Sequence, residues 1–232
     1  MIEVIAFDAD DTLWYTETLY VMTQARFKQI LSPYEINGDI DARLYETEMR
    51  NLQTFGYGTK GFTLSMIETA IELTDGRVRG SDIQKIIDAV RAMMRKEIQL
   101  LDHVAETIPL LAAERTLMII TKGDLLEQES KIARSGLADH FHYIEIVSHK
   151  NEDVYRKLLQ KSGVDIGRFL MVGNSMPSDI LPILALGAPA AHIPHDVTWA
   201  HEQVDVQSEP HGYYELEHVG QVPRLLEQLE SQ

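Results

Sequence analysis

The sequence predicts an α/β fold: a doubly wound and mostly parallel sheet with an all-helical domain inserted after its first strand. Short apolar segments with little polar alternation recur along the chain, as expected for strands that are covered on both faces. From residue 116 onward these segments alternate with helical patterns, which is typical of a parallel sheet. Between the first segment and residue 116 the pattern is helical only, although a crossover needs only about a dozen residues.

Apolar segments at five places are the predicted strands. They are residues 2–7, 116–120, 143–147, 169–172 and 190–193. Three helical patterns follow them: one starts with a capping pattern at Asp124 and Glu127, one covers "NEDVYRKLLQKSG", and one begins at Pro177. Each of these patterns ends at a glycine, as helices commonly do. The residues after 193, including Trp199, are predicted to complete the sheet edge and to end in a helix near 219–230.

The inserted domain is predicted to be a set of helices. They lie at about residues 15–32, 40–55, 62–74, 81–99 and 103–114. In the fourth, Ser81 and Gln84 form a capping-box pattern, and the apolar residues that follow fall on one stripe. The predicted domains are therefore an α/β core at residues 1–14 and 115–232 and a helical cap at residues 15–114.

Composition and charge exclude several classes of protein. The net charge of −15 argues against a nucleic-acid partner, which would require a basic patch. The absence of cysteine excludes disulfides and thiolate metal sites. The sequence shows neither a signal-peptide pattern nor an apolar run of the ~18 residues that span a bilayer. We therefore expect a cytoplasmic protein that does not contact membranes.

Polar side chains gather where the predicted strands end. They are Asp8 and Asp10 after the first strand, Thr121 at the end of the second, Lys150 after the third, and Asn174 and Asp179 after the fourth. In an open parallel sheet, ligands bind beyond the carboxyl ends of the strands. We therefore expect these side chains to share one crevice, in which the acids bind a cation and take part in a reaction.

The order of these residues resembles that of the haloacid dehalogenase-like superfamily of hydrolases. "FDADDTL" is similar to its first motif, Thr121 to its second, Lys150 to its third and "GNSMPSD" to its fourth. The resemblance extends from residue 1 to about residue 195, and the helical insertion falls where members of the superfamily carry a cap. It implies a Rossmann-like core. Within the superfamily it favours the phosphatase branch, because haloacid dehalogenases generally lack the second acid, here Asp10.

The resemblance implies a role for each residue, and chemistry supports the residue types. Asp8 would attack the phosphorus of a phosphate monoester and form an aspartyl-phosphate. Asp10, on the same side of an extended segment, would protonate the leaving alkoxide and then deprotonate the attacking water. Thr121 and Lys150 would hold the phosphoryl oxygens. The expected partner is a small phosphorylated metabolite, over which the cap would close.

Magnesium is the expected cofactor, because Mg²⁺ prefers oxygen ligands. The resemblance implies as its ligands a carboxylate oxygen of Asp8, the main-chain carbonyl of Asp10, and the fourth motif, here Asn174 and Asp179. Asn174 stands where relatives commonly carry an acid. At ~4 Å and an effective dielectric constant of 20, one charge pair is worth about 4 kcal/mol, and weaker repulsion among the acids offsets part of that loss. We therefore expect weakened metal affinity and retained activity.

Some of these residues also have simpler structural interpretations. Asp11 and Thr12 are expected to cap the helix that follows them. Ser178 or Asp179 could cap the helix after the fourth strand. Taken alone, each motif is a weak signal, and the prediction rests on their order along the chain.

Other polar residues are weaker candidates. Lys122 is a rival to the predicted catalytic lysine because it follows Thr121 directly. Lys60 lies on the glycine-rich turn "FGYGTKGF", which is either a plain linker or a loop that reaches the substrate. His192, His195 and His201 have no metal-ligand spacing and are expected to be polar loop residues or edge residues whose hydrogen bonds are satisfied.

Three other functions compete with a phosphatase. A haloacid dehalogenase would share the Asp8 nucleophile but would need no second acid to release a halide. A phosphoacceptor receiver domain would be about half this length, with its aspartate on a later strand. A non-catalytic phosphate-binding protein would keep the crevice and lose turnover, and Asn174 is its only support. The sequence determines neither the physiological substrate, nor the oligomeric state, nor the cap residues that set specificity.

Overall fold

The computed structural model describes residues 1–195 and 211–231, and the chain forms two compact units. The sheet unit comprises Met1–Glu17, Ile98–Lys122 and the described chain from Gln128 onward. The helical unit comprises Thr18–Glu97 and Gly123–Glu127. The sequence extended the helical insertion to residue 114, whereas the main segment of the helical unit ends at Glu97. The predicted contributions of Trp199 and His201 lie outside the described residues.

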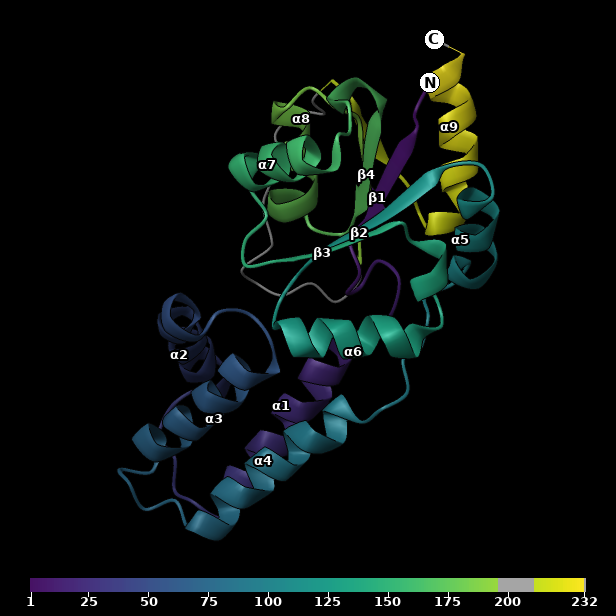
Figure 1. The fold of residues 1–232 in the computed structure, drawn as a ribbon. Helices are drawn as coiled ribbons and strands as arrows, with labels where there is room; N and C mark the ends of the chain where they lie inside the picture. Colours follow the sequence, from purple (N-terminus) through teal and green to yellow (C-terminus); the bar gives the residue numbers. More distant parts are fainter. Residues whose placement is uncertain (196–210, 232) are drawn as a thin grey trace. The chain divides into compact units, whose positions relative to one another are not determined.

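Within the described residues, six parallel strands form one sheet in the order β3-β2-β1-β4-β5-β6 (Figure 1). The strands are β1 Val4–Phe7, β2 Thr116–Lys122, β3 Tyr143–Val147, β4 Phe169–Gly173, β5 Ala190–His192 and β6 Tyr213–Glu215. Phe7 of β1 is in register with Ile119 of β2 and Val172 of β4. The strand order therefore reverses at β1, which is where an open parallel sheet forms its binding crevice. The predicted α/β class with a doubly wound parallel sheet is confirmed.

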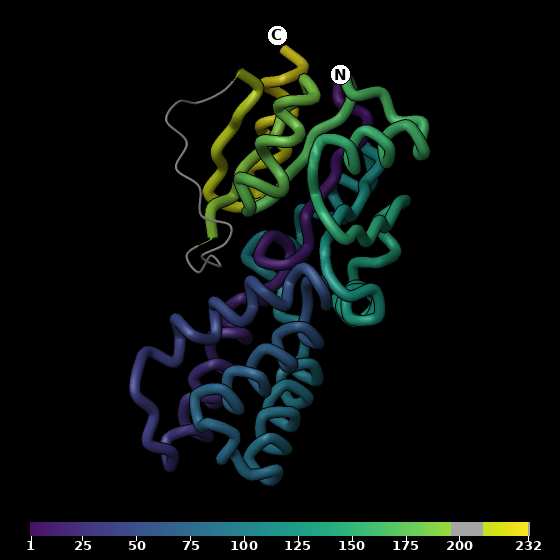
Figure 2. The backbone as a smooth tube through the Cα atoms, turned by 90° about the vertical axis from the view of Figure 1, so that its left-hand side faces the viewer, coloured from purple at the N-terminus to yellow at the C-terminus, as the bar shows by residue number. Residues whose placement is uncertain are grey.

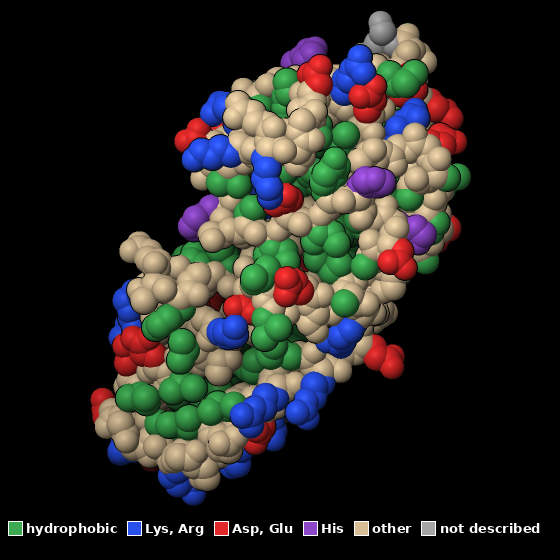
Figure 3. Space-filling view, in the orientation of Figure 1, with side chains coloured by type: hydrophobic (Ala, Val, Ile, Leu, Met, Phe, Trp, Pro, Cys, Tyr) green, Lys and Arg blue, Asp and Glu red, His purple; other side chains and the backbone are tan. Residues whose placement is uncertain are grey.

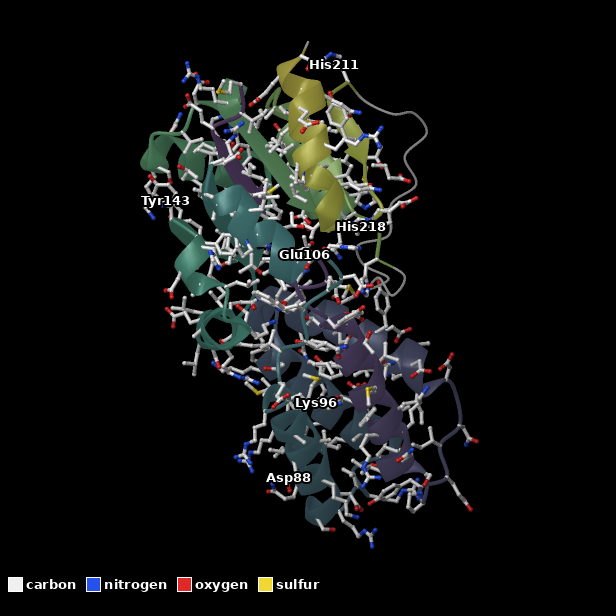
Figure 4. The ribbon with its side chains drawn as sticks, turned by 90° about the vertical axis from the view of Figure 1, so that its right-hand side faces the viewer. Asp88, Lys96, Glu106, Tyr143, His211 and His218 are labelled. Carbon is white, nitrogen blue, oxygen red and sulfur yellow. The ribbon has the colours of Figure 1, made fainter. Side chains whose placement is uncertain are left out.

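The two faces of the sheet bury two different cores. Ile5 and Phe7 of β1 enter one core and Val4 and Ala6 enter the other, as the alternation of side chains along a strand requires. The helices of this unit are α5 Val104–Ala112, α6 Leu125–Ser135 (from Gln128 onward), α7 Glu152–Ser162, α8 Leu181–Ala185 and α9 Val222–Glu230. Helices α5, α6 and α9 contribute to the first core, and α7 and α8 to the second. Figure 4 shows α5 and α9 side by side, with Glu106 on α5 and His218 just before α9.

Helix α5 accounts for the earlier end of the helical unit. Its apolar residues Val104, Ile108 and Leu111 recur at helical spacing and pack into the first core of the sheet. A helix that buries its apolar stripe against the sheet belongs to the sheet unit. The pattern of residues 103–114 correctly predicted a helix but could not show which unit that stripe would contact.

Two helix starts in the sheet unit depend on polar side chains. The Asp11 carboxylate accepts hydrogen bonds from the backbone N–H groups of Thr16 at 2.8 Å and Glu17 at 3.0 Å, which confirms the predicted role of Asp11 before α1. The Thr12 hydroxyl instead donates to Asp8 Oδ2 at 3.4 Å, so the prediction is wrong for Thr12. After β4, a π-helical turn leads into α8, and Ser175 caps it by accepting a hydrogen bond from the N–H of Ser178 at 3.3 Å. The expected cap at Ser178 or Asp179 is therefore wrong.

The helical unit is built from four helices of the described chain. They are α1 Glu17–Leu31 (from Thr18 onward), α2 Ile40–Phe55, α3 Thr59–Leu73 and α4 Gly80–Met94. Figure 2 shows them from a second direction, packed along one another. Their common core includes Phe27, Leu44, Met66, Ile86 and Met93, whereas the neighbouring Met94 is 41% exposed. No helix within residues 1–195 and 211–231 has the length and apolar content needed to cross a bilayer.

The predicted capping box at the start of α4 is wrong. The helix begins at Gly80, so Ser81 lies inside its first turn instead of preceding it. Asp82 instead gathers the polar contacts of this turn, and its side chain is only 2% exposed. The groups that donate hydrogen bonds to Asp82 are Tyr34 Oη at 2.6 Å, Lys85 Nζ at 2.7 Å and Arg79 Nε at 2.9 Å. A buried carboxylate with three donors thus replaces the expected cap.

The surface of the helical unit mixes apolar and basic side chains. Figure 3 shows hydrophobic side chains lying between lysines and arginines on one face of this unit. A groove of about 370 Å³ lies between α1 and α4. Apolar residues such as Met22 line it together with the cations Arg26 and Lys85. Asp88 and Lys96, labelled in Figure 4, lie on its α4 side.

Candidate active site

The ends of β1, β4 and the loop after β3 bring three predicted site residues together. The Lys150 ammonium contacts Oδ1 of Asp8 and lies 2.6 Å from Oδ1 of Asp179. The side chains of Lys150 and Asp179 are each 1% exposed and that of Asp8 is 10% exposed. Segments far apart in the sequence therefore meet at the first aspartate of "FDADDTL".

Burial and neighbouring charges shift the ionisation of this cluster. Burial raises the pKa of Asp8 to about 7, against the lowering effect of the Lys150 ammonium. Burial would lower the pKa of Lys150, but the Asp179 and Asp8 carboxylates outweigh it and raise that pKa well above its usual value. Lys150 is therefore charged, and the Asp8 carboxyl ionises near neutral pH. Groups with perturbed pKa values of this kind cluster at functional sites.

Asp179 orients the lysine. Its Oδ1 accepts a hydrogen bond from Lys150, and its Oδ2 accepts one from the backbone N–H of Ser175 at 3.0 Å. The residue is fully buried. Space for it depends on Gly173, where a Cβ would lie 2.4 Å from Asp179 Oδ2. The glycine of "GNSMPSD" thus makes room for the carboxylate that ends the motif.

Asn174 adjoins Asp8 from the other side. In the orientation that its neighbours favour, the amide nitrogen donates to Asp8 Oδ2 at 3.2 Å, Thr12 Oγ1 at 3.2 Å and the main-chain oxygen of Asp10 at 3.3 Å. A half-turn of the amide would place its oxygen at the same point. Asn174 therefore lies beside two of the oxygens that the family resemblance implies as metal ligands.

The Asp10 carboxylate lies among hydrogen-bond donors from two segments. The donors to Oδ1 are Trp14 Nε1, Thr16 Oγ1 and Lys131 Nζ, each at 2.8 Å. Oδ2 accepts hydrogen bonds from Lys131 Nζ at 2.6 Å and Gln128 Nε2 at 2.9 Å. Burial would raise the pKa of Asp10, but the charge and hydrogen bonds of Lys131, together with Gln128, hold it below its usual value. The donors from Lys131, Gln128 and Thr16 therefore all favour the ionised form of Asp10.

Thr121 and Asp10 are joined through one amide. Thr121 is the last residue but one of β2 and is 1% exposed, and its hydroxyl oxygen accepts a hydrogen bond from Gln128 Nε2 at 3.0 Å. The same nitrogen donates to Asp10 Oδ2 at 2.9 Å and to the main-chain oxygen of Lys122 at 2.8 Å. Sequence reasoning did not include Gln128 or Lys131 in the site. The available signal was their three-residue spacing on the helix that follows the threonine.

Comparison with known proteins identifies the family. A family model described as a haloacid dehalogenase-like hydrolase matches residues 2–187. The chain belongs to this hydrolase family. A crystal structure of a haloacid dehalogenase-like family hydrolase from Xanthomonas campestris is 39% identical, covering 100% of this chain and 93% of that chain with a TM-score of 0.89. None of the curated proteins matches the chain.

More distant structures share the fold of this hydrolase. A 2-haloacid dehalogenase from Pseudomonas syringae pv. Tomato is 23% identical, with a TM-score of 0.68 over 99% of this chain and 100% of that chain. A magnesium-bound HAD-hydrolase from Bacillus subtilis is 15% identical, with a TM-score of 0.69 over 97% of this chain and 98% of that chain. At these identities the likeness concerns the fold alone.

The weaker lysine candidates of the hydrolase, Lys122 and Lys60, have partners other than Asp8. Lys122 Nζ donates to Ser178 Oγ at 2.9 Å, so Lys150 and not Lys122 contacts the first aspartate. Lys60 forms an ion pair with Asp124 at 2.8 Å, and both residues belong to the helical unit. A role for Lys60 toward substrate stays a prediction.

The two described histidines of the predicted group also lie near residues of the hydrolase site, and His192 is the last residue of β5 and not a loop residue. Nε2 of His192 lies 3.0 Å from the main-chain oxygen of Asn174. Nε2 of His195 lies 3.7 Å from Asp11 Oδ1. Both histidines therefore pair with protein groups next to the site residues.

Proposed function

We propose that this hydrolase cleaves a small phosphate monoester with the help of Mg²⁺, through an aspartyl-phosphate formed on Asp8. The observation that carries the proposal is the arrangement of two carboxylates with separate partners. Asp8 lies against the Lys150 ammonium, and Asp10 is tied to Thr121 through Gln128. One aspartate thus adjoins a cation that can bind phosphoryl oxygens, and the other is held as a group that exchanges protons.

The reaction would proceed in two displacements. In the first, a carboxylate oxygen of Asp8 bonds to phosphorus, the bond from phosphorus to the ester oxygen breaks, and the Asp10 carboxyl gives its proton to that oxygen. In the second, a water oxygen attacks phosphorus and the bond from phosphorus to Asp8 breaks. The water proton passes to Asp10, which restores both aspartates and releases phosphate. Lys150 and the Thr121 hydroxyl would bind the phosphoryl oxygens throughout.

The residues around Asp8 fit a magnesium ion. Asp8 Oδ2, the main-chain oxygen of Asp10 and the Asn174 amide lie within hydrogen-bonding distance in one place, and all can offer oxygen, which Mg²⁺ prefers. No group of three or more acidic or histidine side chains in the described parts of the chain is arranged to hold a metal by itself. The site would therefore depend on a carbonyl and an amide besides Asp8, while the oxygens of Asp179 accept hydrogen bonds from Lys150 and the Ser175 N–H. When bound, the ion would neutralise phosphoryl charge.

Hydrolysis of a haloacid is a second candidate, favoured by one observation. Lys131 and Gln128 favour the ionised form of the Asp10 carboxylate, whereas an alkoxide leaving group needs a protonated acid. A halide leaves without a proton. The fold shared with the Pseudomonas syringae dehalogenase allows this chemistry. The phosphatase is preferred because a halide displacement gives Asp10 no task as an acid, and an ionised Asp10 suits the second, water-activating step.

Phosphate and halide release from a common set of substrates would separate the two functions. The set contains p-nitrophenyl phosphate, acetyl phosphate, a panel of phosphorylated metabolites and 2-chloropropionate, each assayed with millimolar Mg²⁺ and with a chelator. We expect phosphate release that needs Mg²⁺ and falls by at least about 10³-fold in Asp8→Asn. The matched control is Asp153→Asn, an exposed aspartate of the same unit whose side chain is 78% accessible.

Three results would contradict the proposal. Halide release without phosphate release would support the dehalogenase. Phosphate binding without turnover of any substrate would support a non-catalytic protein. Phosphatase activity that Asp8→Asn leaves intact would exclude the aspartyl-phosphate at this residue.

A further inference from the structure

Helix α6 provides a second set of contacts to the proposed proton-transfer group. Lys131 Nζ lies 2.6 Å and 2.8 Å from the two oxygens of Asp10, so one ammonium bridges the carboxylate. Gln128 Nε2 donates to Oδ2 of the same group at 2.9 Å. The lysine side chain is 12% exposed, and the glutamine is 2% exposed. The Asp10 side chain that receives them is 25% exposed, so the contacts are partly buried.

The position of these two side chains follows from the helix. Residues three and four apart lie on one side of an α-helix, so Gln128, Lys131 and Ile132 share a face. Ile132 is buried in the core of the sheet unit and fixes the rotation of α6 about its axis. With that rotation fixed, Gln128 and Lys131 are directed to Asp10, and the glutamine also reaches Thr121 at the end of β2.

Packing alone gives no reason to bury these groups. Gln128 Oε1 is buried and has no hydrogen-bond partner within the described part of the chain. An unsatisfied buried acceptor and a nearly buried ammonium both reduce stability relative to apolar side chains of similar size. The Gln128 nitrogen and the Lys131 ammonium both donate hydrogen bonds to Asp10. These contacts hold the Asp10 carboxylate in place, and the cost is a less stable core.

We propose that Lys131 and Gln128 are positioning residues that hold the Asp10 carboxylate in the place and orientation from which it transfers a proton. Trp14 and Thr16 hold Oδ1 from the chain segment of Asp10 itself, and α6 holds the carboxylate from the other side. Gln128 in addition fixes the distance between Asp10 and the Thr121 hydroxyl. The inference rests on the proposed function, in which Asp10 is the acid and base. A misplacement of about 1 Å in such a group can cost on the order of 10²-fold in rate.

The test compares Lys131→Met, Lys131→Arg and Gln128→Leu with the unchanged protein. Steady-state kinetics on the substrate that the proposed panel shows to be hydrolysed best would give kcat and KM separately. We expect Lys131→Met to lower kcat by on the order of 10²-fold while KM changes by less than about 3-fold, and Lys131→Arg to recover most of the loss. Gln128→Leu should lower kcat in the same way. Lys157→Met is the matched control, because Lys157 is exposed on α7 of the same unit, and it should leave kcat unchanged.

A double substitution separates positioning from a general loss of structure. If Lys131 acts through Asp10, then adding Lys131→Met to Asp10→Asn should lower kcat by less than about 2-fold further. A merely structural lysine would give the same loss in both backgrounds. Circular dichroism and thermal unfolding of each variant would show whether it folds, and Lys131→Arg keeps the test valid if Lys131→Met does not fold.

The outcomes distinguish this inference from the proposed function. A protein that hydrolyses phosphate esters and loses activity in Asp8→Asn, but is unchanged in folded Lys131→Met, would overturn the positioning role alone. Equal losses from Lys131→Met with and without Asp10→Asn would do the same. An unchanged protein with no phosphatase activity on any substrate would overturn both.

Discussion

Lys150 places an ammonium between two carboxylates that are almost out of reach of water. Removal of one partner from a buried ion pair typically costs about 3–5 kcal/mol, because the remaining charge has no compensation. The residue therefore stabilises the folded chain as well as supplying a cation to the site. Its position relative to Asp8 depends on Asp179, which receives the same ammonium on its other side.

Gly173 sets the position of Asp179, and we expect Gly173→Ala to disturb it. The added Cβ would lie 2.4 Å from the Asp179 carboxylate, so that side chain must move away from Lys150. Overpacking of this kind typically costs about 1–3 kcal/mol. Urea unfolding would measure the stability loss. Assays of the proposed phosphatase activity should show kcat lowered by on the order of 10-fold or more.

Gly167→Ala is the matched control for this prediction. A Cβ at Gly167 would meet its nearest neighbour, Asp165 Oδ1, at 3.5 Å, which is an ordinary contact. The control should change neither stability nor kcat appreciably. If Gly173→Ala behaved like Gly167→Ala, the close packing at Asp179 would have no functional importance.

The residues of the site differ in how far the sequence could predict them. Asp8, Lys150 and Asp179 follow strands of one parallel sheet, whose topology forces such positions to one edge. Gln128 and Lys131 lie on a helix, where a polar residue in sequence gives no sign of whether it faces solvent or protein. Their role required the rotation of α6, which depends on packing far from them in sequence.

At the scale of elements, helix starts were predicted less well than helices. The pattern of Ser81 and Gln84 matched a capping box, but Asp82 takes over the first turn of α4 because Tyr34, Lys85 and Arg79 converge on it. Tyr34 is 48 residues away in sequence. A local pattern cannot include such a partner, so the boundary moved while the helix itself was correct. The same reasoning applies to Ser175, which caps the turn after β4 in place of the expected residues.

Asp82 should make the stability of the helical unit depend on pH. Hydrogen bonds from Lys85 and Tyr34 lower the pKa of Asp82. Burial would raise this pKa, but with the further contribution of Arg79 it stays well below its usual range. Its stabilising effect is therefore complete above the unfolded pKa of about 3.9 and is lost as pH falls toward the lower folded value. We expect Asp82→Asn to lower the Tm at pH 7 by at least about 3 °C. Between pH 5 and pH 3, the Tm of this variant should fall less than that of the unchanged protein.

Thermal unfolding followed by circular dichroism at several pH values would check this. Asp88→Asn, on the same helix with a side chain that is 57% exposed, is the control and should follow the unchanged protein. An equal pH dependence in Asp82→Asn and the unchanged protein would show that the buried carboxylate does not control acid stability.

At the scale of the whole molecule, the chain divides its apolar residues among separate cores. One core belongs to the helical unit, and the two faces of the sheet bury two others. The sequence predicted two domains from the break in strand–helix alternation. It did not predict that residues 123–127 return to the helical unit, because that return depends on ion pairing and hydrogen bonding to Lys60 and Thr59.

Phe27→Ala should loosen the helical unit more than the sheet unit. Phe27 is 1% exposed in the core of the helical unit, and Phe→Ala substitutions at such sites cost about 3–5 kcal/mol. Hydrogen exchange should rise in α1 to α4 and change little in β1, β2 and β4. Phe169→Ala, at a fully buried position of β4 in the sheet, should give the opposite pattern. Equal exchange increases in both units after either substitution would mean that they unfold as one.

The first turn of helix α6 is divided between the two units, with the boundary after Glu127. Its first residues are bound to the helical unit, where Glu127 Oε2 accepts hydrogen bonds from the Thr59 N–H at 2.9 Å and hydroxyl at 2.8 Å, whereas Gln128 and Lys131 contact Asp10. A continuous helix is a stiff rod on this length scale. The hydrogen bonds of Glu127 to Thr59 and those of Gln128 and Lys131 to Asp10 therefore constrain the same rigid element.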